Sequence, residues 1–144
     1  MILFVIKEKT MSEILGNSTL VMQLLTSALL AILFIQSGLD KVFDWKNNLD
    51  WLQGQFKETP LKGIVSPMLA IVTVIEVAAG AMCLFGVLML LFRADPYWSY
   101  LGSILAGLNI VMLFFGQRMS KEYAGAASLI PYFLLTLASI FIMS

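Results

Sequence analysis

The stretch PMLAIVTVIEVAAGAMCLFGVLMLLF, residues 67–92, contains a single charged side chain, that of Glu76. A helix of this length rises about 39 Å, which is enough to cross the hydrocarbon core of a bilayer, roughly 30 Å thick. The stretch therefore predicts a membrane-spanning helix. It also raises the question of why a carboxylate lies near its middle.

Three further apolar runs of similar length occur in the chain. The four predicted spans are residues 19–39, 64–92, 97–116 and 124–143. The chain has 144 residues, of which 60% are hydrophobic and 12% charged, whereas a soluble domain of this size needs more polar surface. We therefore predict an all-α integral membrane protein, a single domain over residues 1–144. The short second and third connections predict an up-down-up-down four-helix bundle.

The composition excludes several kinds of site and partner. The chain has no histidine and one cysteine, Cys83, so we expect no His-ligated haem, no usual zinc site and no iron–sulfur cluster. Nine basic and nine acidic residues give zero net charge, and nothing in this balance suggests nucleic-acid binding. We expect no metal and no covalently bound cofactor. In a redox role, the electrons would reside on a diffusible molecule, such as a quinone, or on a partner.

The segment of residues 40–63 is the longest connection between predicted spans. Its apolar side chains recur at spacings of four, three and four, typical of one helix face: Trp45, Leu49, Leu52 and Phe56. We predict an amphipathic helix over about residues 43–57 that lies at the membrane surface, with Trp45, Trp51 and Phe56 as its interfacial residues. A loop that packs against its own bundle is the alternative, with equal weight.

The Lys and Arg residues near the span ends predict the orientation of the bundle. Six lie on the side of the first and third connections: Lys41, Lys46, Lys57, Lys62, Arg118 and Lys121. Three lie on the side of the termini: Lys7, Lys9 and Arg93. The positive-inside rule therefore places both termini outside the cytoplasm and the amphipathic segment inside it. The sequence is compatible with a translation start at Met1 or at Met11.

The strongest polar groups of all four spans are predicted to lie in one leaflet. Measured from the side of the first and third connections, Glu76 lies about 12 Å deep, Asn109 about 10 Å and Tyr132 about 13 Å. The predicted polar cluster consists of Glu76, Asn109, Tyr132 and Gln36, below a rim of Lys41, Gln117 and Arg118. The other leaflet contains weaker polar groups, among them Gln23, Thr26, Ser27, Ser99 and Ser103.

Helical spacing predicts which polar residues point into the bundle, because lipid cannot satisfy their hydrogen bonds. The predicted inward stripes are Thr73, Glu76, Gly80 and Cys83 in the second span, Gly102, Ala106, Asn109 and Leu113 in the third, and Ser128, Tyr132 and Thr136 in the fourth. Gly102 and Ala106 form a small-xxx-small pattern, which lets helices approach closely.

Glu76 is the strongest candidate for a functional role. An ionised carboxylate near the bilayer centre is unfavourable by about 2.5–3.5 kcal/mol, so we expect Glu76 to be protonated or paired. Lys41 and Arg118 are the nearest basic residues, and their long side chains can reach toward it. Pro131 leaves the carbonyl group of Ala127 without a helical partner, which makes that carbonyl a second candidate. Asn109 and Tyr132, taken singly, are predicted to join helices by hydrogen bonds.

Three stretches of the chain resemble DoxX-like membrane proteins of the kind found in Bacteroidota. They are SGLDKVFDW at residues 37–45, TVIEVAAG at residues 73–80 and FFGQRMSKEYAGAASLIPYF at residues 114–133. The resemblance extends over nearly the whole chain from about Leu20, and its third stretch is the most specific. It implies a four-helix bacterial inner-membrane protein, with termini on the periplasmic side by the charge rule. It also implies a relation to the small membrane subunits of thiosulfate:quinone oxidoreductase.

The resemblance assigns no catalytic set, but Glu76, Lys41 and Gln117 match polar positions that recur in the family. We expect an accessory subunit of a membrane oxidoreductase complex that lines a pocket for a quinone or another small molecule, with other membrane protein subunits as partners. The first alternative is a structural scaffold subunit of a larger membrane assembly. The second is a small proton-linked transporter that uses Glu76. If the chain takes part in catalysis, it does so at most as a subunit of an oxidoreductase.

Overall fold

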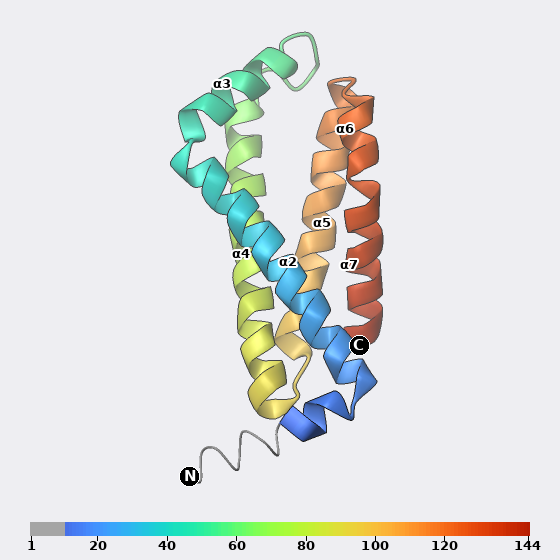
Figure 1. Cartoon of the computed structure of the whole chain (residues 1–144). Helices are drawn as coiled ribbons and strands as arrows, with labels where there is room; N and C mark the ends of the chain where they lie inside the picture. Colours follow the sequence, from blue (N-terminus) through green and yellow to red (C-terminus); the bar gives the residue numbers. More distant parts are fainter. Residues whose placement is uncertain (1–10) are drawn as a thin grey trace.

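The computed structural model describes residues 11–144 (Figure 1). Its helices are α2 (Ser18–Phe43), α3 (Trp45–Gln55), α4 (Val65–Arg93), α5 (Tyr97–Met119), α6 (Tyr123–Ser128) and α7 (Ile130–Met143). Helices α2, α4 and α5, and α6 together with α7, are long and apolar enough to cross a membrane. The described residues contain no strand, so the predicted all-α membrane class is confirmed. The start at Met1 and the charges of Lys7 and Lys9 lie outside the described residues.

The spans run alternately in opposite directions, as predicted (Figure 1). Helix α2 packs against α4, α4 against α5 and α5 against α7, and α7 returns to contact α2. The turn between α4 and α5 is short because Ala94 adopts the left-handed conformation, with a φ of 51°, and ends α4. The carboxylate of Asp95 then accepts a hydrogen bond from the backbone N–H of Tyr97, at 3.0 Å, where α5 begins.

Glycines set the close approach of α4 to its two neighbours. A Cβ atom on Gly80 would lie 2.6 Å from the backbone nitrogen of Ile35 in α2. A Cβ atom on Gly102 would lie 3.0 Å from the backbone nitrogen of Cys83 in α4. Because lipid gives helices no hydrophobic reason to associate, close backbone packing of this kind holds the spans together. The small-xxx-small pattern that begins at Gly102 therefore lies at a helix contact, as predicted.

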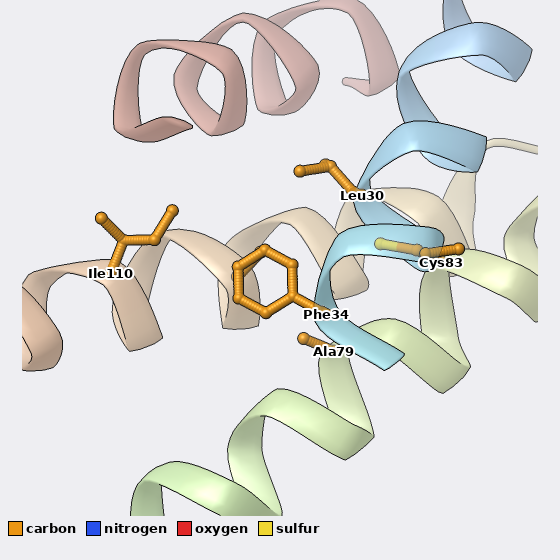
Figure 2. Close-up of a cluster of buried hydrophobic side chains, with 7 residues drawn as sticks. Leu30, Phe34, Ala79, Cys83 and Ile110 are labelled. Atoms are coloured by element: carbon orange, nitrogen blue, oxygen red, sulfur yellow. The ribbon is translucent and has the colours of Figure 1, made fainter. Parts of the chain in front are cut away.

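The core of the bundle lies among α2, α4 and α5. Figure 2 shows Leu30 and Phe34 from α2 near Ala79 and Cys83 from α4, and Ile110 of α5 belongs to the same cluster. All four residues of the predicted second-span stripe are buried: Thr73, Glu76, Gly80 and Cys83. In the third span Gly102, Ala106 and Asn109 are buried and Leu113 is half-buried. Helical spacing therefore predicted the inward faces of these two spans correctly.

The predicted inward stripe of the fourth span was right at Thr136 and wrong at Ser128 and Tyr132. Tyr132 is 43% exposed and Ser128 is also exposed, whereas the buried polar residues of α7 are Thr136 and Ser139. A spacing of four residues drifts by about 40° at each step from the helical period, and the helix is also interrupted at Leu129. Helical spacing counted from α6 therefore does not predict which residues of α7 point inward.

The predicted amphipathic helix is present as α3, within the residue range expected. It contacts both α2 and α4 and therefore packs on the end of its own bundle. Phe56, just after its last residue, is buried, while Trp51 is 61% exposed. Contact of Trp45 and Trp51 with lipid headgroups stays a prediction.

Candidate functional site

Glu76 is buried in the bundle with an ion-pair partner. Its side chain is 1% exposed, and the ammonium nitrogen of Lys41 lies 2.9 Å from Oε2. The hydroxyl group of Ser37 donates a hydrogen bond to Oε1 at 3.3 Å, and the amide of Asn109 donates to the same oxygen at 3.1 Å. The carboxylate therefore receives three donors from α2 and α5. The expectations that Glu76 is paired and that Asn109 lies beside it are both confirmed.

The Lys41 side chain reaches down along α2 to meet this carboxylate. Its ammonium group also donates to the hydroxyl of Ser37, one helical turn earlier, at 3.0 Å, and approaches the Ser37 carbonyl oxygen at 3.5 Å. The aliphatic part of the lysine crosses apolar surroundings while the charged end finds polar partners. Ser37 was not among the predicted site residues, although its position four residues before Lys41 places both on one face of the helix.

Three predicted members of the polar cluster lie elsewhere. Tyr132 and Gln36 are exposed on the outside of the bundle. Gln36 directly precedes Ser37, and successive residues of a helix point about 100° apart, so the inward position belongs to Ser37. Arg118 is also exposed, and its guanidinium carbon lies 4.4 Å from the centre of the Tyr123 ring, a cation–π contact. Depth counting alone predicted Gln36 and Arg118, and depth does not fix the direction of a side chain. Tyr132 was predicted by helical spacing as well, and that spacing fails across the interruption at Leu129.

A cavity of about 410 Å³ lies beside the ion pair, at the end of the bundle covered by α3. Its polar lining residues are Lys41, Glu76 and Ser37 next to the ion pair, and Asn48, Gln55, Gln117, Ser120 and Glu122. Most of the rest is apolar, with Leu52 and Phe56 from the α3 region and Leu113 from α5 among the lining residues. Part of the apolar face of the amphipathic segment is thus directed at this cavity, which the sequence did not predict.

Gln117 lies on the wall of the cavity that α5 forms. The sequence predicted a turn there, but α5 continues to Met119, so Gln117 belongs to its last full turn. Its Oε1 atom is buried and has no hydrogen-bond partner among residues 11–144. Gly125 provides the room that this amide occupies, because a Cβ atom there would collide with Oε1.

The opposite half of the bundle contains a second polar layer, made mainly of serines. The Ser27 hydroxyl lies 2.8 Å from the Ser99 hydroxyl and 2.8 Å from the carbonyl oxygen of Cys83, and Ser103 pairs with Ser139. These contacts connect α2, α4, α5 and α7. The sequence predicted weak polar groups here but did not predict that they pair with one another.

A bundle of four apolar spans of this kind defines a multi-pass integral membrane protein, associated with a lipid bilayer. The chain belongs to the DoxX family, whose sequence pattern matches residues 22–93. This match contains Ser37, Lys41 and Glu76, but it ends before α5. No curated protein and no solved structure matches the chain significantly. The resemblance expected over residues 114–133 is therefore not part of the family match.

Proposed function

We propose that the chain is an accessory subunit of a membrane oxidoreductase complex, and that its cavity binds the head group of a quinone or a similar small amphipathic molecule. The observation that carries this proposal is the position of the ion pair between the partly exposed Lys41 and the buried Glu76 on the wall of a cavity of about 410 Å³. Membership of the DoxX family supports the oxidoreductase part, because family members are associated with oxidoreductase subunits.

The residues of the cavity fit such a ligand. Its volume falls in the range of about 300–1,000 Å³ that is typical of small-molecule sites, and those sites combine apolar walls with few polar groups. Leu52, Phe56 and Leu113 offer apolar surface to a ring. The ammonium of Lys41 has two good partners, and its third contact, to the Ser37 carbonyl oxygen, is long at 3.5 Å, so a ligand carbonyl oxygen can replace this weak contact. A bound quinone would supply the electron-accepting chemistry.

The comparison with the serine layer favours a binding role over a scaffold. Small hydroxyl groups already join the helices in the other half, and they need no buried charge. A buried ion pair is weak evidence for stability, because removing two charges from water offsets most of their attraction. A pair placed on a cavity wall therefore suggests that the charge serves a ligand. The transporter alternative has less support, since α2, α4 and α5 are continuous helices and only the fourth span is interrupted, at Leu129.

The binding part is tested by purifying the protein from its own membranes in mild detergent and measuring bound quinones by mass spectrometry. In Leu113→Trp, the larger side chain should fill the cavity and remove the quinone. The matched control is Leu108→Trp on the same helix, where Leu108 is 50% exposed and does not line the cavity. We expect quinone in the wild type and in Leu108→Trp, and little in Leu113→Trp. Equal amounts in all three would contradict the assignment of the cavity.

The subunit part needs a separate measurement. Blue-native electrophoresis of the same membranes should show the chain in a complex with a redox-active partner, and its deletion should lower quinone-dependent electron transfer. A chain that always migrates alone, with unchanged electron transfer after deletion, would contradict this part.

A further inference from the structure

The polar groups of the cavity differ in kind from one wall to another. On the α2 and α4 side, Oε1 of Glu76 accepts from Ser37 and Asn109, and Oε2 has the Lys41 ammonium at 2.9 Å but no other partner among the described residues. The Lys41 ammonium has one N–H whose only contact is the long one of 3.5 Å to the Ser37 carbonyl oxygen. On the α5 side, the buried Oε1 atom of Gln117 has no donor among the described residues. The carboxylate of Glu122, exposed just before α6, lines the same cavity. One wall thus offers the Lys41 ammonium beside a carboxylate that it already pairs with, and the other offers the oxygens of Gln117 and Glu122 beside the Gln117 amide N–H₂.

We infer that the cavity prefers a head group that carries a hydrogen-bond donor, such as the hydroxyl of a quinol, and that Gln117 is the residue that determines this preference. The inference rests on the proposed function. An oxygen of the ligand accepts a hydrogen bond from Lys41, while a hydroxyl group donates to Oε1 of Gln117. A quinone has only acceptor oxygens, so it satisfies Lys41 and leaves the Gln117 oxygen without a partner.

The size of the preference follows from the burial of this oxygen. A buried polar group left without a partner is unfavourable by about 1–3 kcal/mol, which corresponds to roughly a fivefold to hundredfold difference in affinity. Sites built to bond a hydroxyl group reject analogues that lack it for this reason. Because Gln117 lies at the edge of the cavity rather than deep in the bundle, we expect a value near the lower end, about fivefold to tenfold.

The test compares the two redox forms of one short-chain benzoquinone, bound to the protein in nanodiscs under anaerobic conditions. Trp51 lines the cavity and its fluorescence reports occupancy in both titrations. In the wild type the quinol should bind about fivefold to tenfold more tightly than the quinone. Gln117→Leu should lower the ratio of the quinol affinity to the quinone affinity to about one. Gln53→Leu, on the exposed side of α3, is the matched control and should keep it.

Gln117→Glu provides a second variant, because a carboxylate presents acceptor oxygens in either orientation of its plane. It should keep the preference for the quinol. Equal affinities for quinol and quinone in the wild type, or a preference that persists in Gln117→Leu, would overturn the inference and leave the cavity as a quinone site. Failure of both forms to bind would instead contradict the proposed function.

Discussion

The two polar halves of this bundle are built from different chemistry. In the half of the bundle that contains the C-terminus, the serine layer joins four helices with short hydroxyl contacts. Glycines such as Gly86 allow the backbones to approach closely there. Toward α3, the partly exposed Lys41 pairs with the buried Glu76 and a cavity lies next to them. The comparison teaches that helix association in this fold needs no charge. The charge occurs where packing is incomplete.

The largest effect is expected when the positive charge of Lys41 is removed. Lys41→Met leaves Glu76 buried without its partner and should lower the free energy of unfolding by about 3 kcal/mol. Circular dichroism during SDS titration of mixed micelles would measure it. The double variant with Glu76→Gln should recover part of the loss, because no uncompensated charge remains.

The control for this prediction is Lys46→Met, at an exposed position of α3, which should stay within about 0.5 kcal/mol of the wild type. If Lys41→Met were no more damaging than this control, the ion pair would contribute little to stability. The ion-pair half and the serine half would then not differ in how much a single polar contact contributes to stability.

A second prediction concerns packing. A Cβ atom on Gly86 would lie 2.7 Å from the backbone nitrogen of Ser99, whereas a Cβ atom on Gly116 would meet a ring carbon of Phe56 at 3.4 Å. Gly86→Ala should therefore destabilise the protein by about 1–3 kcal/mol, since backbone cannot move aside. Gly116→Ala, beside the cavity, should be neutral or slightly stabilising, because alanine favours helix over glycine by about 1 kcal/mol.

Both glycine variants are measured by the same SDS titration. Similar losses of stability in the two would show that the end of the bundle beside the cavity is as tightly packed as the serine half.

The smallest effect is expected within the serine layer itself. A double-mutant cycle of Ser103→Ala and Ser139→Ala should give a coupling energy of about 0.6 kcal/mol, the average for interhelical hydrogen bonds in membranes. The measurement is again the unfolding free energy of the four proteins. A coupling energy as large as the Lys41 effect would contradict the view that this layer works through many weak contacts.

The spans and the inward faces of α4 and α5 were predictable because both depend on local sequence. Continuous apolar runs decide which segments enter a bilayer, and helical spacing decides that Glu76 and Asn109 face inward. Tyr132 and Arg118 show where this reasoning fails. Their depth was counted along the helix axis, but the break at Leu129 and the contact of Arg118 with Tyr123 turn these side chains away.

The sequence by itself determined that this is a four-span helical membrane protein with a carboxylate deep in its second span, because hydropathy and helical period are properties of short segments. The tertiary structure decided which side chains pair with that carboxylate and where a cavity remains. Both depend on contacts between residues far apart in the chain, such as Lys41 with Glu76 and Gln117 with Gly125. The cavity remains because of the way in which α3 packs near the end of α5, and the sequence of neither segment alone specifies that packing.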